Sequence, residues 1–468
     1  MDRRAGSDAP QRGTLAVLCA ADVLVALDAT GVGVALPSIQ DAVGFSATGL
    51  QWVVTAYTVS LGAFVLVGGR IADTIGPLRT LRAGLAVSAA GSLLAGVARD
   101  PAVLVAARAL GGAGAALAIP AALALLAATF PRAPERTRAI GVVSTGIDGG
   151  MVLGAVLGGT VTAALGWRWV FLLAVPIAVM TAAVAPRVLG EQRSHGRAGR
   201  VDPLAAPVAA TGLAALILAL TQVEARGVAA PATLVPFAAG VLLLSAFAAL
   251  ERRVADPLVP RAVLHRRRAR AANLAIVANA GAFGGLLVLS ALAMQRVMGF
   301  GALEAGLGFI PLALSAAAGG PAAAPLAARF GVPRLVGVSF VVTAAAMLWL
   351  AVARNHAYLT ALLPAFAVAG FTFATAAVPL TAAAVADAGP AEQGAAAGVF
   401  QTCTHAGGAA VLAVLVVAAA AWSHRIAGDG APGADALAAG YRFAFALTAA
   451  LLLAGAVVTA ALLRERRE

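Results

Sequence analysis

Lysine is absent from this chain of 468 residues, so all 33 basic side chains are arginines. Charged residues of every kind make up only 12% of the sequence, whereas 61% of it is hydrophobic. Soluble domains carry about twice that share of charge, so this composition excludes an ordinary globular protein. Apolar stretches of about 20 residues recur along the chain, and each is long enough to cross a bilayer. We therefore predict an all-α polytopic membrane protein.

Other shortages exclude several kinds of chemistry. Cys19 and Cys403 are the only cysteines, and both lie in apolar stretches, so the sequence offers no disulfide framework and no metal-ligand spacing. No GxxxxGK[ST] motif occurs, which excludes ATP hydrolysis through a P-loop. No HExxH and no nucleophile–base pattern is present. The net charge is +12, but the arginines form no patch interleaved with aromatics. We expect no enzymatic activity, no metal, no cofactor and no nucleic-acid partner.

The apolar stretches divide into about 14 predicted spans. Their approximate bounds are 14–36, 48–69, 80–98, 101–128, 138–160, 167–186, 203–221, 232–250, 270–293, 303–326, 333–352, 357–381, 393–421 and 440–463. If the N-terminus is cytoplasmic, 25 arginines fall on the cytoplasmic side and six on the other. This asymmetry follows the positive-inside rule and predicts that both termini are cytoplasmic.

Two aspartates interrupt the first apolar stretch, Asp22 and Asp28. A carboxylate in the centre of a membrane helix costs on the order of 3 kcal/mol, so intramembrane acids are candidates for functional sites. The two residues are six positions apart and point to nearly opposite sides of a helix. Only one of them can comfortably face a central cavity.

Five segments carry a resemblance to a known family. They are LDATGVGVALPSI (27–39), GGRIADTIGPLR (68–79), ARALGGAGAALAIP (107–120), GAVLGG (154–159) and WRWVFLLAVPI (167–177). Together they resemble the signatures of the 14-helix drug:proton antiporters of the major facilitator superfamily, and the likeness extends over nearly the whole chain. The chain departs from that pattern at several positions. Gly31 and Gly33 replace Ile and Asn, Thr74 replaces a basic residue, Gly111 replaces Gln, and Ala155 replaces Pro.

The resemblance implies the major facilitator fold, with two six-helix bundles and two inserted helices. The corresponding parts are a cytoplasmic tail (1–13), an N-terminal bundle (14–186), a linker (187–202), the inserted helices (203–250), a basic linker (251–269), a C-terminal bundle (270–463) and a second tail (464–468).

Proton coupling is assigned to intramembrane charges. Asp28 carries the Asp-x-Thr pattern of the family and lies deeper than Asp22, so we expect it to bind the proton. Arg108 lies about eight residues into its helix and needs a carboxylate, carbonyl groups or water as a partner, unless it extends to the outer membrane surface. Asp148 is a further coupling candidate, with a hydrogen bond to a Ser or Thr as the alternative.

The loop between the second and third helices provides the conformational gate in this resemblance. Its residues here are Gly69, Asp73, Gly76 and Arg79, and Thr74 predicts a weaker gate. The alternative for Asp73 is simple solvation at a helix end.

Small residues recur every three or four positions in the fifth helix. Its antiporter motif would comprise Gly154, Gly158 and Gly159, with tight helix packing as the alternative. The substrate cavity is assigned to Thr30, Gln401 and His405, although a mid-helix histidine is more often a satisfied core residue. Gly31 and Gly33 suggest a wider or differently shaped pocket near Asp28.

These features together predict a proton-coupled exporter of an amphipathic drug-like molecule, such as an antibiotic, in the cytoplasmic membrane. Its partners would be the substrate, protons and the lipid bilayer, and it would act as a monomer. A transporter of a polar metabolite and a membrane protein without transport activity are the alternatives.

Overall fold

A computed structural model describes the backbone of most of the chain. The described residues are 5–45, 47–190, 202, 204–227, 230–254, 257–260, 263, 265–353, 358–389, 392–428 and 433–462. Helices make up nearly all of these ranges, and no strand occurs within them. They divide into two compact units, of which the first comprises 1–218, 238–265 and 385–402, and the second comprises 219–237, 266–384 and 403–468.

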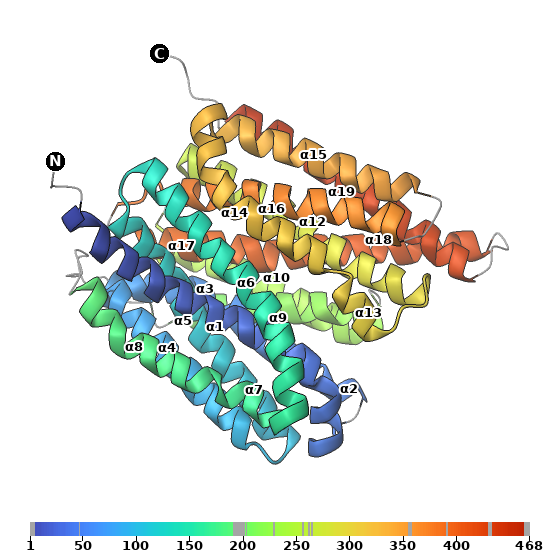
Figure 1. Cartoon of the computed structure of the whole chain (residues 1–468), viewed down its shortest axis with the longest axis horizontal. Helices are drawn as coiled ribbons and strands as arrows, with labels where there is room; N and C mark the ends of the chain where they lie inside the picture. The colour runs from blue at the N-terminus through green and yellow to red at the C-terminus, as the bar shows by residue number, and fades with distance from the viewer. Residues whose placement is uncertain are drawn as a thin grey trace. The chain divides into compact units, whose positions relative to one another are not determined.

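The described residues up to Glu251 form ten helices (Figure 1). They are α1 (Ala5–Val43), α2 (Ala47–Leu50), α3 (Trp52–Ile75), α4 (Pro77–Val97), α5 (Pro101–Thr129), α6 (Ala133–Leu165), α7 (Arg168–Leu172), α8 (Ala174–Leu189), α9 (Ala205–Arg226) and α10 (Pro231–Glu251).

The described residues from Arg267 onward form eight α-helices and two short π-helical segments. They are α12 (Arg267–Arg296), α13 (Ala302–Leu307), α14 (Ile310–Phe330), α15 (Val332–Val352), η1 (Tyr358–Leu362), α16 (Leu363–Ala384), α17 (Gln393–Thr402), η2 (Cys403–Gly407), α18 (Gly408–Gly428) and α19 (Gly433–Leu462).

The predicted spans are confirmed as helices. Thirteen helical stretches of the described chain are long and apolar enough to cross a membrane. The remaining predicted span, 138–160, lies within α6, whose 33 residues extend about 50 Å. The second, sixth, tenth, twelfth and thirteenth spans each contain a break or a change of helix type. Since neighbouring helices satisfy the backbone groups at such breaks, these irregularities are compatible with a membrane span.

Glycine and proline together end one helix and begin the next at two connections between helices. Gly76 has φ +97° between α3 and α4, and Gly331 has φ +80° between α14 and α15. In both places a proline stands in the first turn of the following helix, Pro77 and Pro333. Glycine adopts positive φ without steric cost, and proline lacks the N–H that the first helical turn leaves unpaired.

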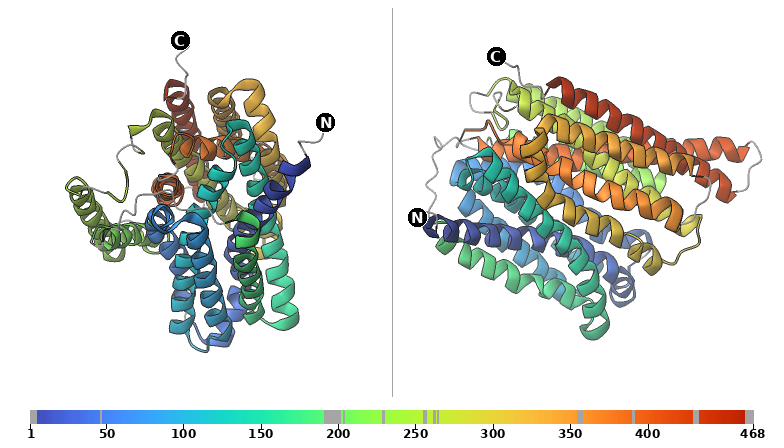
Figure 2. Two further views of the ribbon diagram at one scale, coloured as in Figure 1. Left: turned by 90° about the vertical axis from the view of Figure 1, so that its left-hand side faces the viewer. Right: turned by 45° about the horizontal axis from the view of Figure 1, so that its top comes forward.

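Small residues hold the helices of the first unit close together. Helix α5 packs on both α3 and α4, while α1 packs on α6 and α8 (Figure 2). At Gly112 an added Cβ would collide with the carbonyl of Tyr57 on α3, and at Gly91 it would lie 2.6 Å from the backbone nitrogen of Gly111. Such close backbone contact is typical of membrane helices, where van der Waals packing replaces the hydrophobic effect.

Hydroxyl groups connect two helices inside the second unit. Ser339 on α15 and Thr375 on α16 have their hydroxyl oxygens 3.0 Å apart, and those of Thr343 and Thr372 are 2.6 Å apart. All four side chains are buried. These two hydrogen-bonded pairs, here called the hydroxyl ladder, fix the register of α15 against α16 because a buried polar group needs a partner.

Candidate functional site

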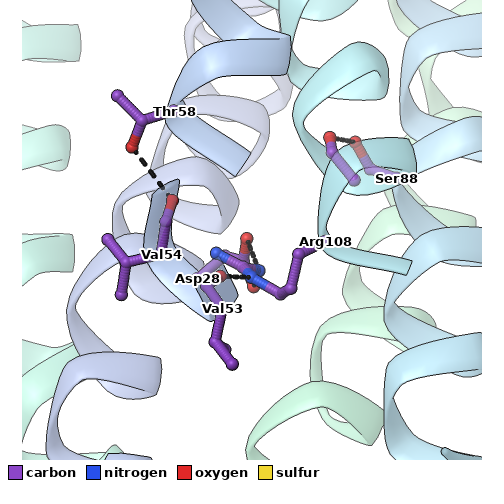
Figure 3. Close-up of polar contacts among 7 residues, drawn as sticks. Asp28, Val53, Val54, Thr58, Ser88 and Arg108 are labelled. Carbon is purple, nitrogen blue, oxygen red and sulfur yellow. Dashed lines mark hydrogen bonds and ion pairs between the residues drawn. The ribbon is translucent and has the colours of Figure 1, made fainter. Parts of the chain in front are cut away.

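A buried ion pair joins Asp28 on α1 to Arg108 on α5 (Figure 3). The Nη1 group of Arg108 donates to both carboxylate oxygens, at 2.7 Å to Oδ1 and 2.6 Å to Oδ2. Its Nε group donates to the carbonyl of Val53 at 2.9 Å. The side chains of Arg108 and Asp28 are 4% and 11% exposed, so the pair is largely shielded from solvent.

Aromatic rings complete the surroundings of Arg108. The guanidinium carbon lies 4.4 Å from the ring centre of Tyr57 and 5.7 Å from that of Phe171. A guanidinium beside an aromatic ring gains a further favourable electrostatic contact. Arg108 therefore has a carboxylate, a carbonyl and a ring as partners, and its extension to the membrane surface is excluded by its burial.

Asp22, the other acid within the apolar part of α1, is half-buried and makes no hydrogen bond or ion pair within the described part of the chain. Of these two aspartates, Asp28 is the one that faces an arginine. An acid with a single buried cationic partner has the chemistry of a proton-binding switch, since its protonation removes the ion pair.

A second charged contact lies at the ends of α3 and α17, both in the first unit. Asp73 accepts hydrogen bonds from the backbone N–H groups of Gly394 and Ala395, each at 2.7 Å. These are the first residues of α17, whose amino end carries partial positive charge. At Gly69, one turn before Asp73, an added Cβ would collide with the carbonyl of Gly394. Asp73 and Gly69 therefore both contact the start of α17. Asp73 is bonded to that helix and is not simply solvated at the end of α3.

The other residues of the predicted gate lie apart from that contact. Gly76 lies between α3 and α4 and has a φ of +97°, a backbone conformation that glycine adopts without strain. Arg79 is exposed and makes no ion pair or hydrogen bond to any described residue. Thr74 donates to the carbonyl of Arg70 in its own helix at 2.9 Å.

Sequence reasoning missed a buried arginine in the first unit. Arg136, in the first turn of α6, is 6% exposed. Burial lowers the pKa of its guanidinium, and the negative charge of Asp387 opposes that effect. Asp387 belongs to the same unit as Asp73 and α17. Its charge was counted only as a loop charge for topology, and its burial could not be read from the sequence.

The glycines of α6 lie against α1. An added Cβ at Gly158 would be 2.6 Å from the Cα of Gly31, and one at Gly31 would be 3.2 Å from the carbonyl of Gly154. The expected wider pocket at Gly31 is therefore wrong, because its space is filled by the backbone of α6. Gly33 is exposed and has open space around it. Gly159 is half-buried in the same helix.

The remaining predicted residues are only partly placed. The side chains of Thr30 and Asp148 lie outside the described residues. Gln401 is near the end of α17, and His405 is inside the π-helical segment η2. Both are half-buried. No cluster of His, Cys, Asp or Glu able to hold a metal occurs among the described residues.

A family model and several known proteins match nearly the whole chain. The family model of the Major Facilitator Superfamily matches residues 18–412 and 272–468. The chain is 37% identical to the puromycin resistance protein pur8 of Streptomyces alboniger, over 99% of this chain and 93% of that protein. It is 36% identical to the cephamycin export protein CmcT of Amycolatopsis lactamdurans, over 95% and 91%.

Solved structures share the fold. The human organic anion transporter MFSD10 (TETRAN) has a TM-score of 0.66 at 18% identity, with 96% of this chain and 99% of that chain covered. The proton:xylose symporter XylE has a TM-score of 0.65 at 14% identity, with 96% and 95% covered. With its many apolar helices and bacterial relatives, this is a multi-pass protein of the cell membrane. The chain belongs to the Major Facilitator Superfamily.

Proposed function

We propose that this protein exports an amphipathic organic compound of the antibiotic class from the cell in exchange for entering protons. Curated relatives that match nearly the whole chain are named for puromycin resistance and cephamycin export. The observation that carries the proton-coupled part is the buried pair of Asp28 and Arg108. The transported species are the drug-like molecule and protons, and we expect no enzymatic activity, no cofactor and a functional monomer embedded in lipid.

Asp28 would exchange its proton with the outside in one conformation and with the cytoplasm in the other. Protonation would neutralise the carboxylate and remove its attraction to Arg108. Arg108 would keep the carbonyl of Val53 and the ring of Tyr57 as partners, so the cation would not be left isolated. One proton moving through 100 mV supplies about 2.3 kcal/mol, which is enough for moderate concentration ratios.

The contact of Asp73 with the start of α17 would act as the cytoplasmic gate. Its two hydrogen bonds join segments 321 and 322 residues apart in the sequence. We propose that Gly69 allows this approach, that Gly76 sets the turn and that Arg79 serves topology. Gly154, Gly158 and Gly159 would provide the close α1–α6 surface, Asp148 a secondary proton site, and Thr30, Gln401 and His405 substrate contacts.

Efflux in everted membrane vesicles tests this proposal. The protein is expressed in an efflux-deficient bacterial host, and resistance to a panel of antibiotics that begins with puromycin selects the substrate. We expect drug-induced proton release from the vesicles, which a protonophore abolishes. Asp28→Asn should abolish the coupled signal, whereas Asp41→Asn, at an exposed position of the same helix, should leave it intact. Efflux that survives collapse of the proton gradient would refute the antiport mechanism.

Both termini are proposed to be cytoplasmic, since 25 arginines lie on that side of the predicted topology and six on the other. Fusions of a fluorescent protein that folds only in the cytoplasm test this directly. Fluorescence from both terminal fusions is expected, and a dark C-terminal fusion at normal expression would contradict the orientation.

A further inference from the structure

A small cavity borders Asp28 inside the first unit, with a volume of about 20 Å³. Its polar lining consists of Asp28, Tyr57 on α3, and Ser88 and Ser92 on α4, and Gly111 on α5 forms part of its wall. One water molecule needs about 10 to 15 Å³ of such space and two to four polar partners. The cavity therefore has the size and the lining of a site for a single water.

Gly111 keeps this space open. A Cβ added there would lie 3.8 Å from two ring atoms of Tyr57. No atom of any other described residue outside its own helix turn would lie within 4 Å of it. The family motif that this segment resembles has a glutamine at the same position. The absent side chain leaves a void that a water molecule can occupy, beside the carboxylate of Asp28.

The polar groups around the void have bonding capacity to spare. The Ser88 hydroxyl donates to the carbonyl of Gly111 at 3.4 Å, which is long for a hydrogen bond (Figure 3). Ser92 makes no hydrogen bond to any described residue, and the same holds for the Tyr57 hydroxyl. Each carboxylate oxygen of Asp28 accepts one bond from Arg108 and has a second lone pair available.

The charged and titratable groups that face Asp28 cannot themselves deliver its proton readily. Arg108 stays protonated in proteins and serves only as a donor of hydrogen bonds. Tyr57, the other group in electrostatic contact with Asp28, is buried beneath the guanidinium. Among the described groups, neither of these two is a ready proton donor, and the cavity beside the carboxylate offers a route for the proton.

We propose that one water molecule, held by the hydroxyls of Ser88 and Ser92 against the Asp28 carboxylate, is the immediate proton donor and acceptor of the coupling site. In the uptake step a hydronium ion in the cavity transfers a proton to a carboxylate oxygen. One O–H bond of the hydronium breaks, the O–H bond of the carboxylic acid forms, and neutral water remains. This inference rests on the proposed role of Asp28.

Infrared difference spectra test the site without any transport substrate. Purified protein in lipid nanodiscs is cycled between acidic and alkaline buffer, in ordinary water and in water labelled with oxygen-18. We expect a carboxylic C=O band of Asp28 and, with it, a water O–H band that shifts with the isotope. Both bands should be absent in Asp28→Asn.

The variant Ser88→Ala/Ser92→Ala should keep the carboxyl band, lose the isotope-sensitive water band and slow proton uptake at least about tenfold. Gly111→Ala should weaken the same water band by filling part of the void. Two matched controls should change neither band. Ser245→Ala removes a hydroxyl bonded within its own helix, and Gly284→Ala places a methyl at ordinary contact distance, 3.7 Å from Leu412.

The outcomes separate this inference from the proposed function. A normal carboxyl band without any isotope-sensitive water band in the wild type would overturn the water site and leave Asp28 as the proton site. Persistence of the water band and of the uptake rate in the double serine variant would overturn it as well. A missing carboxyl band would refute the coupling role of Asp28 and, with it, the water site.

Discussion

At the scale of single residues, Arg108 is distinguished by the geometry of its partners. Its Nη1 group donates to the two carboxylate oxygens of Asp28, and its Nε group donates to the carbonyl of Val53. The guanidinium group lies over the ring of Tyr57. A lysine carries the same charge but has a single nitrogen on a flexible stem, so it cannot make all of these contacts together. The charge alone therefore does not define this site.

We predict that Arg108→Lys lowers proton-coupled efflux about ten- to a hundredfold, because it loses a charge-assisted hydrogen bond of about 1.5 to 3 kcal/mol. Initial rates of drug efflux in vesicles measure this. Arg168→Lys is the matched control, since Arg168 also donates to a carbonyl, that of Ala98, and lies beside a ring, that of Trp167. Equal losses in both variants would contradict a special role for the pair with Asp28.

At the scale of helices, two kinds of contact hold neighbouring elements in register. In the first unit the contacts are made by glycines, and in the second unit the hydroxyl ladder joins α15 to α16. Their repeated small or polar residues were visible in the sequence. The sequence did not show which helix each of these residues contacts, because the same spacing is compatible with packing against any neighbouring helix.

Gly158→Ala is expected to destabilise the protein by about 1 to 3 kcal/mol, because the new methyl meets the backbone of Gly31 and the two helices must separate. Unfolding in mixed micelles of increasing SDS content measures the change. Gly33→Ala is the control on the facing helix, at a position with open space. Helix propensity favours alanine over glycine at both positions, so equal destabilisation by the two substitutions would contradict the role of the contact.

Thr343→Val removes one rung of the hydroxyl ladder with little change of shape. We expect it to destabilise the protein by about 0.6 to 1.7 kcal/mol, the range for hydrogen bonds between membrane helices. The same SDS titration applies. Thr448→Val is the control, because that buried hydroxyl bonds only to the carbonyl of Ala444 in its own helix. A smaller loss at Thr343 than at Thr448 would contradict the role of the ladder.

At the scale of the whole molecule, transport requires a conformational equilibrium that a cytoplasmic contact can bias. Asp73 holds the start of α17 through two hydrogen bonds, and the buried Arg136 acts electrostatically with Asp387 in the same unit. The predicted weakness of this gate rested on Thr74. The hydroxyl of Thr74 donates within its own helix, to the carbonyl of Arg70, so the proposed gate depends on Asp73.

Asp73→Ala should shift the equilibrium toward the cytoplasm-open state by on the order of 3 kcal/mol, since two charge-assisted hydrogen bonds are lost. Labelling of single cysteines introduced near the start of α17 by a thiol reagent from the cytoplasmic side measures this shift as a faster rate. The control is Asp100→Ala, which removes a comparable bond to the backbone nitrogen of Val103 at the start of α5. An unchanged labelling rate in Asp73→Ala would refute the gate.

The sequence by itself determined the number and type of the helices, the class of the protein and the few charges inside them. These properties are local, because a run of apolar residues is long enough to span a bilayer whatever its neighbours are. Only the tertiary structure decided which groups meet. Asp28 lies 80 residues from Arg108, and Asp73 lies 321 residues from Gly394, so their pairing depends on how glycine-lined helices pack and not on any spacing along the chain.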